Sequence, residues 1–267
     1  MGVARRWAHR RRFGISPAAG GAALSDNVVF ALRDVEKVYS AGGTSFHLSI
    51  PYLDIARGSK LALIGESGSG KSTLLELLAM ILMPSKSGSF RFTPREDSTA
   101  SDIGLIWRSR DSDQLSDLRS RHIGYVLQHG GLLPYLTVQK NIELPRELLN
   151  LPVNGVASDL AGKLGITQQL NKLPAALSVG QRQRAAIARA LAHEPPIVIA
   201  DEPTAAIDPL NAKRILALLV ELVESLGVTL ILATHAHDLV RQRGFTLLTH
   251  EIKTDDEQTM TVMVSNA

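Results

Sequence analysis

The chain has 267 residues, of which 45% are hydrophobic and 21% are charged. These proportions are typical of a globular protein, and they exclude a mainly disordered, fibrous or low-complexity chain. The sequence contains no cysteine, which excludes a disulfide scaffold, a thiolate metal site, a cysteine nucleophile and an iron–sulfur cluster. The lack of cysteine also fits a reducing compartment such as the cytosol.

The formal net charge is +3 at pH 7, but the positive charge is concentrated near the N-terminus. A short segment there holds five arginines and no acidic residue: Arg5, Arg6, Arg10, Arg11 and Arg12. The rest of the chain is mildly acidic, so it lacks the basic surface that is typical of nucleic-acid-binding domains. We therefore expect no nucleic-acid partner.

Residues 1–26 combine these arginines with glycine, proline and alanine and show no sustained periodicity. We expect this segment to be a flexible basic arm. The alternative is a contact with acidic lipid headgroups, to which Trp7 and Phe13 would add apolar anchors. The arm is not followed by the long apolar segment of a secretory signal. No run of 18 or more apolar residues occurs anywhere, so we do not expect the chain to cross a membrane by itself.

From residue 28 onward, short aliphatic runs bounded by Gly, Ser or Pro predict strands, and apolar residues at helical spacing predict helices. The expected strands are residues 28–32, 46–50, 61–64, 123–127, 197–200 and 229–233, with a terminal hairpin at 245–248 and 260–264. Helices are expected at residues 72–83 and 210–226 and throughout a helical insert at about 136–192. Parallel strands joined through helices follow from this order. No internal repeat is visible, and we expect residues 27–267 to form a single domain.

A phosphate-binding loop lies between an expected strand and an expected helix. It consists of Gly65, Glu66, Ser67, Gly68, Ser69, Gly70, Lys71 and Ser72, which together match the pattern of such loops in full. The glycines allow backbone N–H groups to turn inward on the phosphates, and the following helix offers the positive end of its dipole. Lys71 would reach the β- and γ-phosphates, and the Ser72 hydroxyl would bind Mg²⁺. We expect the loop and the adjacent Thr73 to bind a nucleotide.

Two carboxylates follow the apolar strand at residues 197–200. The carboxyl ends of parallel strands are where open sheets bind their ligands. Asp201 is placed to hold Mg²⁺ through its water shell, and Glu202 to polarise an attacking water as a general base. Two acids at a strand end can also be a merely solvated terminus, and the phosphate-binding loop in the same chain is what favours the functional interpretation.

The segment Leu177-Ser178-Val179-Gly180-Gln181, followed by a helical pattern from Arg182, stands just before the carboxylate strand. This segment resembles the signature of ABC-type ATPases, in which the serine hydroxyl, the glycine backbone and the helix N-terminus face a phosphate. The resemblance covers about residues 27–250. It implies an α/β fold of the P-loop NTPase (RecA-like) type, with a parallel-sheet core, an N-terminal antiparallel β subdomain and a helical signature subdomain.

The resemblance also implies roles for single residues of this chain. Tyr39 matches the aromatic residue that stacks on adenine, although it could also be an ordinary tyrosine at a strand end. Gln128 matches the glutamine that contacts Mg²⁺ and the attacking water and senses the membrane partner. Asp208 matches the acid of the loop that crosses the dimer interface, and His235 matches the histidine that contacts the γ-phosphate. Ser178, Gly180 and Gln181 would act on the ATP held by a second subunit.

This sequence departs from the common family pattern at two positions. Val179 stands where glycine is more common, and Ala236 stands where aspartate usually follows the histidine. Within the family, residues 118–128 and 133–138 are similar to the subgroup that drives lipoprotein release, macrolide or peptide export, and the cell-division complex. The cargo and the direction of transport do not follow from this similarity.

The resemblance implies an ATPase subunit of a membrane transporter that uses ATP and Mg²⁺. Two copies would enclose two ATP molecules head to tail and drive a separate membrane-spanning permease from the cytoplasmic face of the inner membrane. The surface after Gln128, which includes Gly130, Gly131, Leu132, Leu133 and Tyr135, is the expected seat of the permease. A regulatory component that gates a cell-envelope enzyme without moving cargo is the main alternative. A soluble ATPase that acts on DNA or ribosomes fits less well, because the chain has one cassette and no heptad run.

Overall fold

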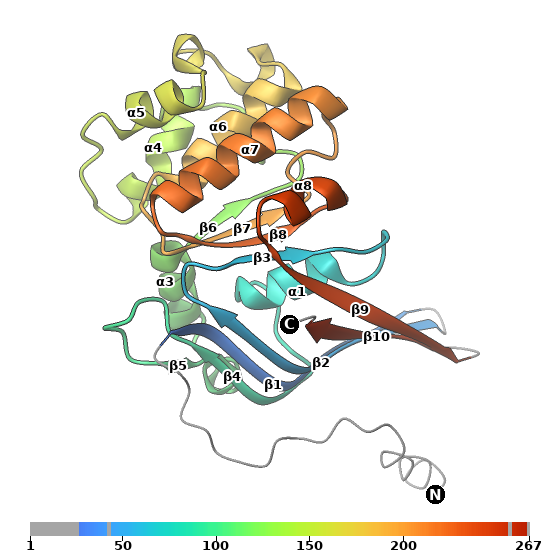
Figure 1. The fold of residues 1–267 in the computed structure, drawn as a ribbon. Coiled ribbons are helices and arrows are strands. Elements are labelled where there is room, and N and C mark those ends of the chain that lie inside the picture. The colour runs from blue at the N-terminus through green and yellow to red at the C-terminus, as the bar shows by residue number, and fades with distance from the viewer. Residues whose placement is uncertain (1–26, 42–43, 256–257, 266–267) are drawn as a thin grey trace, which may run out of the picture.

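The computed structural model describes residues 27–41, 44–255 and 258–265. The expected arm at residues 1–26 lies outside these ranges. In the described part of the chain, the strands form one ten-stranded sheet with the order β5-β4-β1-β2-β10-β9-β3-β8-β7-β6. Figure 1 shows this sheet running from the antiparallel N-terminal strands, below, to the parallel strands and the helices that cover them, above.

The N-terminal half of the sheet is antiparallel. Its strands are β1 (Val28–Ala41), β2 (Thr44–Ala56), β4 (Lys86–Phe92) and the short β5 (Ser101–Asp102). Strand β1 pairs with β2 on one side and with β4 on the other. Because β1 has partners on both sides, its pairing with β2 continues beyond residue 32, through positions such as Glu36 and Lys37 that carry polar side chains. Both β1 and β2 are therefore longer than the apolar runs predicted.

The C-terminal half of the sheet is mainly parallel. It contains β3 (Lys60–Leu63), β6 (Ile123–Val126), β7 (Ile197–Asp201) and β8 (Thr229–Ala233), and β9 (Thr246–Asp255) pairs parallel with β3. The expected terminal hairpin is confirmed, since β9 and β10 (Gln258–Ser265) pair antiparallel. β10 also pairs parallel with β2 and thereby joins the two halves.

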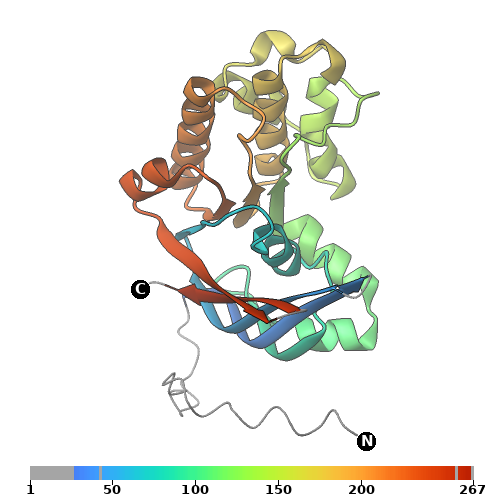
Figure 2. The ribbon, with the colours of Figure 1, turned by 90° about the vertical axis from the view of Figure 1, so that its right-hand side faces the viewer.

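The helices cover both faces of the parallel strands (Figures 1 and 2). They are α1 (Lys71–Leu78), α2 (Ile103–Ser109), α3 (Ser112–His122), α4 (Val138–Leu148), α5 (Val156–Lys163), α6 (Val179–Leu191), α7 (Pro209–Ser225) and α8 (His237–Gln242). Two short 3-10 helices, η1 (Thr167–Gln169) and η2 (Pro174–Ala176), precede α6.

Two hydrophobic cores meet at the parallel strands. Val198 of β7 and Leu230 of β8 face a core that also contains side chains of α4 to α7. Their neighbours Ile199 and Ile231 face a second core, which contains α1 and the antiparallel strands. Because successive side chains of a strand point to opposite faces, a continuous apolar run is what a strand buried on both faces requires. This confirms the expected fold class of a parallel core with an antiparallel β part and a helical part.

The structure also differs from the sequence prediction in several further elements, since β4, β5 and α8 match no expected strand or helix. Helix α1 ends at Leu78 instead of residue 83, because Met80 adopts a positive φ of 56° that an α-helix does not accommodate. Helices α2 and α3 were not expected from the sequence. Asp102 and Asp111 cap their N-termini, but α3 buries only Leu115 and therefore lacks the apolar periodicity that predicts a helix.

Gly124 of β6 lies where the strand crosses α6, and it sets how closely the two can approach. A Cβ atom placed on Gly124 would lie 2.1 Å from the carbonyl oxygen of Ala190. We expect Gly124→Ala to lower the free energy of unfolding by about 1–3 kcal/mol, because backbone would have to move. Gly162→Ala on α5 is the control, since nothing lies within 4 Å of its Cβ position. Equal stabilities of the two variants in chemical denaturation would contradict this interpretation.

Candidate functional site

The phosphate-binding loop connects β3 to α1. Gly68 and Gly70 have φ angles of +82° and +88°, in the left-handed region that glycine enters without strain. These angles turn the chain so that helix α1 begins at Lys71. The N-terminus of α1 therefore points into the loop, where it favours negative charge.

Lys71 lies at the centre of the loop. Its side chain is only 5% exposed, and its Nζ donates hydrogen bonds to the carbonyl oxygens of Gly65 and Glu66, both at 2.8 Å. The same Nζ lies 3.5 Å from Oε1 of Glu202. The loop thus holds one buried cation in the position where a polyanion would need it.

Glu202 lies directly after β7 and faces the loop. Its Oε1 is 2.9 Å from Nε2 of His235, which follows β8. Its backbone N–H donates to the carbonyl oxygen of Ala233, and its φ of 42° turns it out of the strand. The ends of two neighbouring parallel strands therefore bring Glu202 and His235 together beside Lys71, at the edge of the sheet where such folds commonly bind ligands.

Asp201, the last residue of β7, accepts a hydrogen bond from the hydroxyl of Ser72. Burial raises the pKa of Asp201, and the neighbouring Glu202 adds to the increase, while Ser72 and Lys71 oppose it. Oxygen donors of this kind suit Mg²⁺, which usually binds to one or two carboxylates plus substrate phosphates. Among the described residues, no three His, Asp or Glu side chains cluster into a metal site of their own. Ser72 and Asp201 therefore fit an ion that is held jointly with a nucleotide.

Tyr39, near the end of β1, lies close to the start of α1. Its hydroxyl is hydrogen-bonded to Thr73, and its ring is 41% exposed. Lys37 Nζ lies 5.0 Å from the ring centroid and the Phe46 ring lies 6.4 Å away. Tyr39 is therefore a partly exposed aromatic residue next to the loop.

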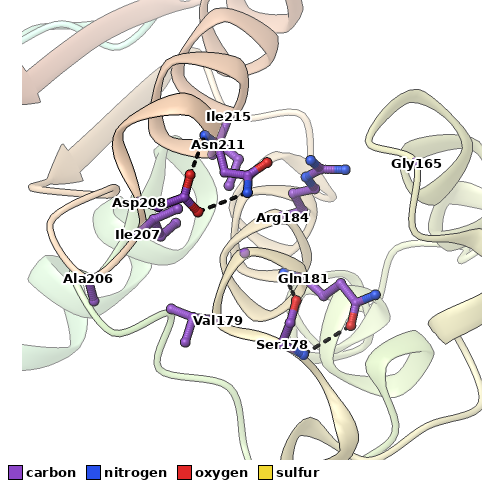
Figure 3. A pocket seen from close by; sticks show the side chains of 11 residues that line it. Gly165, Ser178, Val179, Gln181, Arg184, Ala206, Ile207, Asp208, Asn211 and Ile215 are labelled. Atoms are coloured by element: carbon purple, nitrogen blue, oxygen red, sulfur yellow. Dashed lines mark hydrogen bonds between the residues drawn. The ribbon is translucent and has the colours of Figure 1, made fainter.

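Ser178 and Asp208 line a separate pocket of about 430 Å³. Ser178 caps α6 and forms a reciprocal pair of hydrogen bonds with Gln181, and Asp208 caps α7 by accepting from Asn211 (Figure 3). The other lining residues are Gly165, Val179, Gly180, Arg184, Ala206, Ile207 and Ile215. No motif in the sequence marks Gly165, Arg184, Asn211 or Ile215 as part of this pocket. For Arg184 alone there was a signal, because it lies on the same helix as the signature residues, three positions after Gln181.

The structure thus divides the predicted site residues into two groups. Lys71, Ser72, Asp201, Glu202 and His235 meet at the loop, whereas the pocket of Ser178 and Asp208 is lined by no residue of the loop. One chain does not bring the signature to its own phosphate-binding loop. Gln181 Oε1 is engaged by the backbone of Ser178, so its side chain supports the cap.

Gln128 belongs to neither group. It is exposed in the turn that follows β6 and makes no hydrogen bond with Ser72 or Asp201 in the described part of the chain. The preceding Leu127 is 45% exposed, and Tyr135 further along the chain is 73% exposed.

The raised pKa of Asp201 gives a testable consequence for stability. Because the folded-state pKa lies above that of the unfolded chain, the ionised carboxylate destabilises the fold at neutral pH, and this penalty disappears as the pH falls through that pKa. We expect Asp201→Asn to raise the free energy of unfolding at pH 7 without nucleotide or Mg²⁺, and the difference from the parent protein to shrink toward pH 4. Chemical denaturation at both pH values measures this. A difference that grew on acidification would contradict the assignment.

Comparison with known proteins agrees with this geometry. The family described as ABC transporter matches residues 48–205. The macrolide export ATP-binding/permease protein MacB of Nitrosomonas europaea is 40% identical over 79% of this chain and 31% of its own length. The methionine import ATP-binding protein MetN of Xanthomonas oryzae pv. oryzae is 38% identical over 78% of this chain and 60% of its own length. The chain therefore spans less than two thirds of these curated relatives.

Solved structures show the same relationship. The dimeric post-hydrolysis state of the ATP-binding cassette MJ0796, bound to ADP and Pi, has a TM-score of 0.71 and 30% identity, and the match covers 86% of this chain and 95% of that one. The structure of cbiO1 from Clostridium perfringens, part of the ABC transporter complex cbiONQ, has a TM-score of 0.69 and 29% identity, with 87% of both chains covered. In the described residues, no helix is long and apolar enough to span a bilayer. The chain belongs to the ABC transporter family, and its fold is that of an ATP-binding cassette.

Proposed function

We propose that Lys71, Glu202 and His235 form the hydrolytic centre of this cassette, with Ser72 and Asp201 as its Mg²⁺-binding residues. The observation that carries the proposal is the position of Glu202 Oε1 at the phosphate-binding loop, 3.5 Å from Nζ of the buried Lys71 and 2.9 Å from Nε2 of His235. Phosphoryl transfer to water depends on positioning and charge stabilisation. These three side chains supply both.

Entry of a triphosphate would change the partners of Lys71. Its ammonium would exchange the carbonyl oxygens of Gly65 and Glu66 for phosphate oxygens, which are stronger partners because they are charged. Glu202 would then be free to accept a proton from an attacking water, and His235 would face the γ-phosphate. Mg²⁺, when bound, neutralises phosphate charge in such sites. Tyr39 would stack on the adenine through its exposed ring.

We further propose that two copies enclose two nucleotides head to tail. The pocket at Ser178 has a helix N-terminus and a serine hydroxyl but no lysine to bind a phosphate by itself. The loop at Lys71, conversely, has no contribution from Ser178 or Asp208 in the same chain. Each half-site would therefore complete the half-site of the other copy. The similar cassette MJ0796 is dimeric in its post-hydrolysis state with ADP and Pi. Val179, 43% exposed at the pocket, would be covered in such a dimer.

The association of two copies around ATP would act on a partner protein, which would be a membrane-spanning permease. Leu127 and Tyr135 are 45% and 73% exposed, and exposed apolar side chains of this kind suit a cover by another protein. Gln128 directly follows Leu127, so a movement of this turn toward the metal site would couple nucleotide binding to the permease. We propose a position at the cytoplasmic face of the inner membrane for this assembly. The relatives include an exporter and an importer by name, and neither cargo is assigned to this chain.

Replacement of Glu202 by glutamine tests the hydrolytic centre. Glu202→Gln keeps the size of the side chain but cannot accept a proton, so we expect ATP hydrolysis to fall by roughly 10²–10⁴-fold while ATP binding persists. Because bound ATP then accumulates, size-exclusion chromatography with ATP and Mg²⁺ should show a dimer, with the parent protein mostly monomeric. Glu221→Gln, an exposed carboxylate on α7, is the control and should hydrolyse at the parent rate. Unchanged hydrolysis by Glu202→Gln would assign the base to another residue.

A mixing experiment tests the head-to-tail arrangement. Lys71→Ala damages the loop and Ser178→Arg damages the signature, so each homodimer should be inactive. A mixed dimer would contain one site with both defects and one site with neither, and we expect part of the parent ATPase activity to return on mixing. Crosslinking of differently tagged subunits would verify that mixed dimers form. Mixed dimers without activity would argue against sites shared between two chains.

A further inference from the structure

The phosphate-binding loop rests on a floor made by four side chains from three strands: Phe46 and Leu48 of β2, His250 of β9 and Met263 of β10. A Cβ atom at Gly70 would lie 3.0 Å from Phe46 Cζ, 3.3 Å from Leu48 Cδ1 and 3.8 Å from Met263 Cε. A Cβ atom at Gly65 would lie 2.1 Å from Cε1 and 2.7 Å from Nδ1 of His250. The imidazole of His250 is thus in direct contact with the backbone at the first residue of the loop.

The place of His250 in its strand would suit an apolar residue. Leu248 pairs with Leu63 of β3 and is 1% exposed in the core that contains α1. His250 follows two residues later and therefore points to the same face. Its partner across the β9–β10 hairpin, Met263, is 4% exposed. A leucine at position 250 would also pack over Gly65. Packing alone therefore does not explain why this position carries a side chain with ring nitrogens.

A buried hydroxyl lies next to the same point of the loop. Ser69 is 3% exposed, and its Oγ has no hydrogen-bond partner. This Oγ lies 2.9 Å from the Cβ position at Gly65, to which His250 Nδ1 is also close. A buried hydroxyl without a partner is costly, and native structures nearly always satisfy such groups. His250 is the floor residue with a hydrogen-bonding group to offer it.

We propose that His250 is a positioning residue of the phosphate-binding loop, whose Nδ1 accepts a hydrogen bond from the Ser69 hydroxyl when nucleotide is bound. This inference rests on the proposed nucleotide site. The hydrogen bond would tie the loop to the C-terminal hairpin and hold the backbone N–H groups of the loop in the arrangement that receives phosphate. The loop loses conformational entropy when it binds a nucleotide. The hydrogen bond to the hairpin would offset part of that loss and thereby favour binding. His250 acts through Ser69 and does not touch the nucleotide.

Four variants of the full chain test this role by their ATP dissociation constants, measured with Mg²⁺. His250→Leu keeps an apolar group over Gly65 but removes the acceptor, and Ser69→Ala removes the donor. We expect each to weaken ATP binding by about 3- to 10-fold, the usual worth of one hydrogen bond. His250→Asn places an amide oxygen near the position of Nδ1 and should restore most of the affinity. The double variant His250→Leu, Ser69→Ala should bind no more weakly than either single variant.

Thermal unfolding without nucleotide accompanies each titration and separates loop positioning from loss of fold. The inference predicts weaker ATP binding by His250→Leu with an unfolding temperature no lower than that of the parent. Parent-like affinity in either single variant, or additive losses in the double variant, would overturn it. If the parent protein itself bound no ATP, the proposed function would fail and the role of His250 with it. If the parent protein bound ATP and His250→Leu bound it equally well, the proposed function would stand and only the role of His250 would be wrong.

Discussion

The functional site of this molecule depends on the balance between negative and positive charge at the carboxyl edge of the parallel strands. Asp201 and Glu202 place two carboxylates side by side after β7, and burial already raises the pKa of Asp201. Lys71, 5% exposed, supplies the opposing charge from the loop. Each of these groups would be costly in isolation, because a buried charge requires a partner. The cation of the loop therefore offsets part of the negative charge at the strand end.

The same balance explains why the site can respond to a nucleotide. In the structure, Lys71 is satisfied by two loop carbonyls and lies near Glu202, while Glu202 is also bonded to His235. In the proposed mechanism, a triphosphate would replace the two loop carbonyls as the partner of Lys71 and would draw His235 away from Glu202. The carboxylate that is now paired would become available to water at the step where a base is needed.

The division of the chain into two half-sites follows from its two cores. The core around α1 supports the phosphate-binding loop, whereas the core around α6 and α7 supports the pocket of Ser178 and Asp208. Parallel strands β7 and β8 contribute to both cores through their two faces. A second copy is the simplest means of joining a loop and a signature that one chain holds apart.

The sequence by itself determined the chemistry of this protein, because that chemistry depends on residue types at fixed local spacing. The glycines and Lys71 of the loop, the carboxylates after the strand at residues 197–200 and the serine of the signature are each set by a few neighbouring residues. The order of strands and helices likewise indicated the parallel core, and the signature segment at residues 177–181 indicated the family. Only the tertiary structure showed that α1 stops early and that two helices with little apolar periodicity precede β6. It also decided which side chains meet across long separations, such as Arg184 with Asp208 in one pocket and His250 against Gly65. Those contacts depend on how β9, α6 and α7 pack against distant segments, which no local pattern in the sequence records.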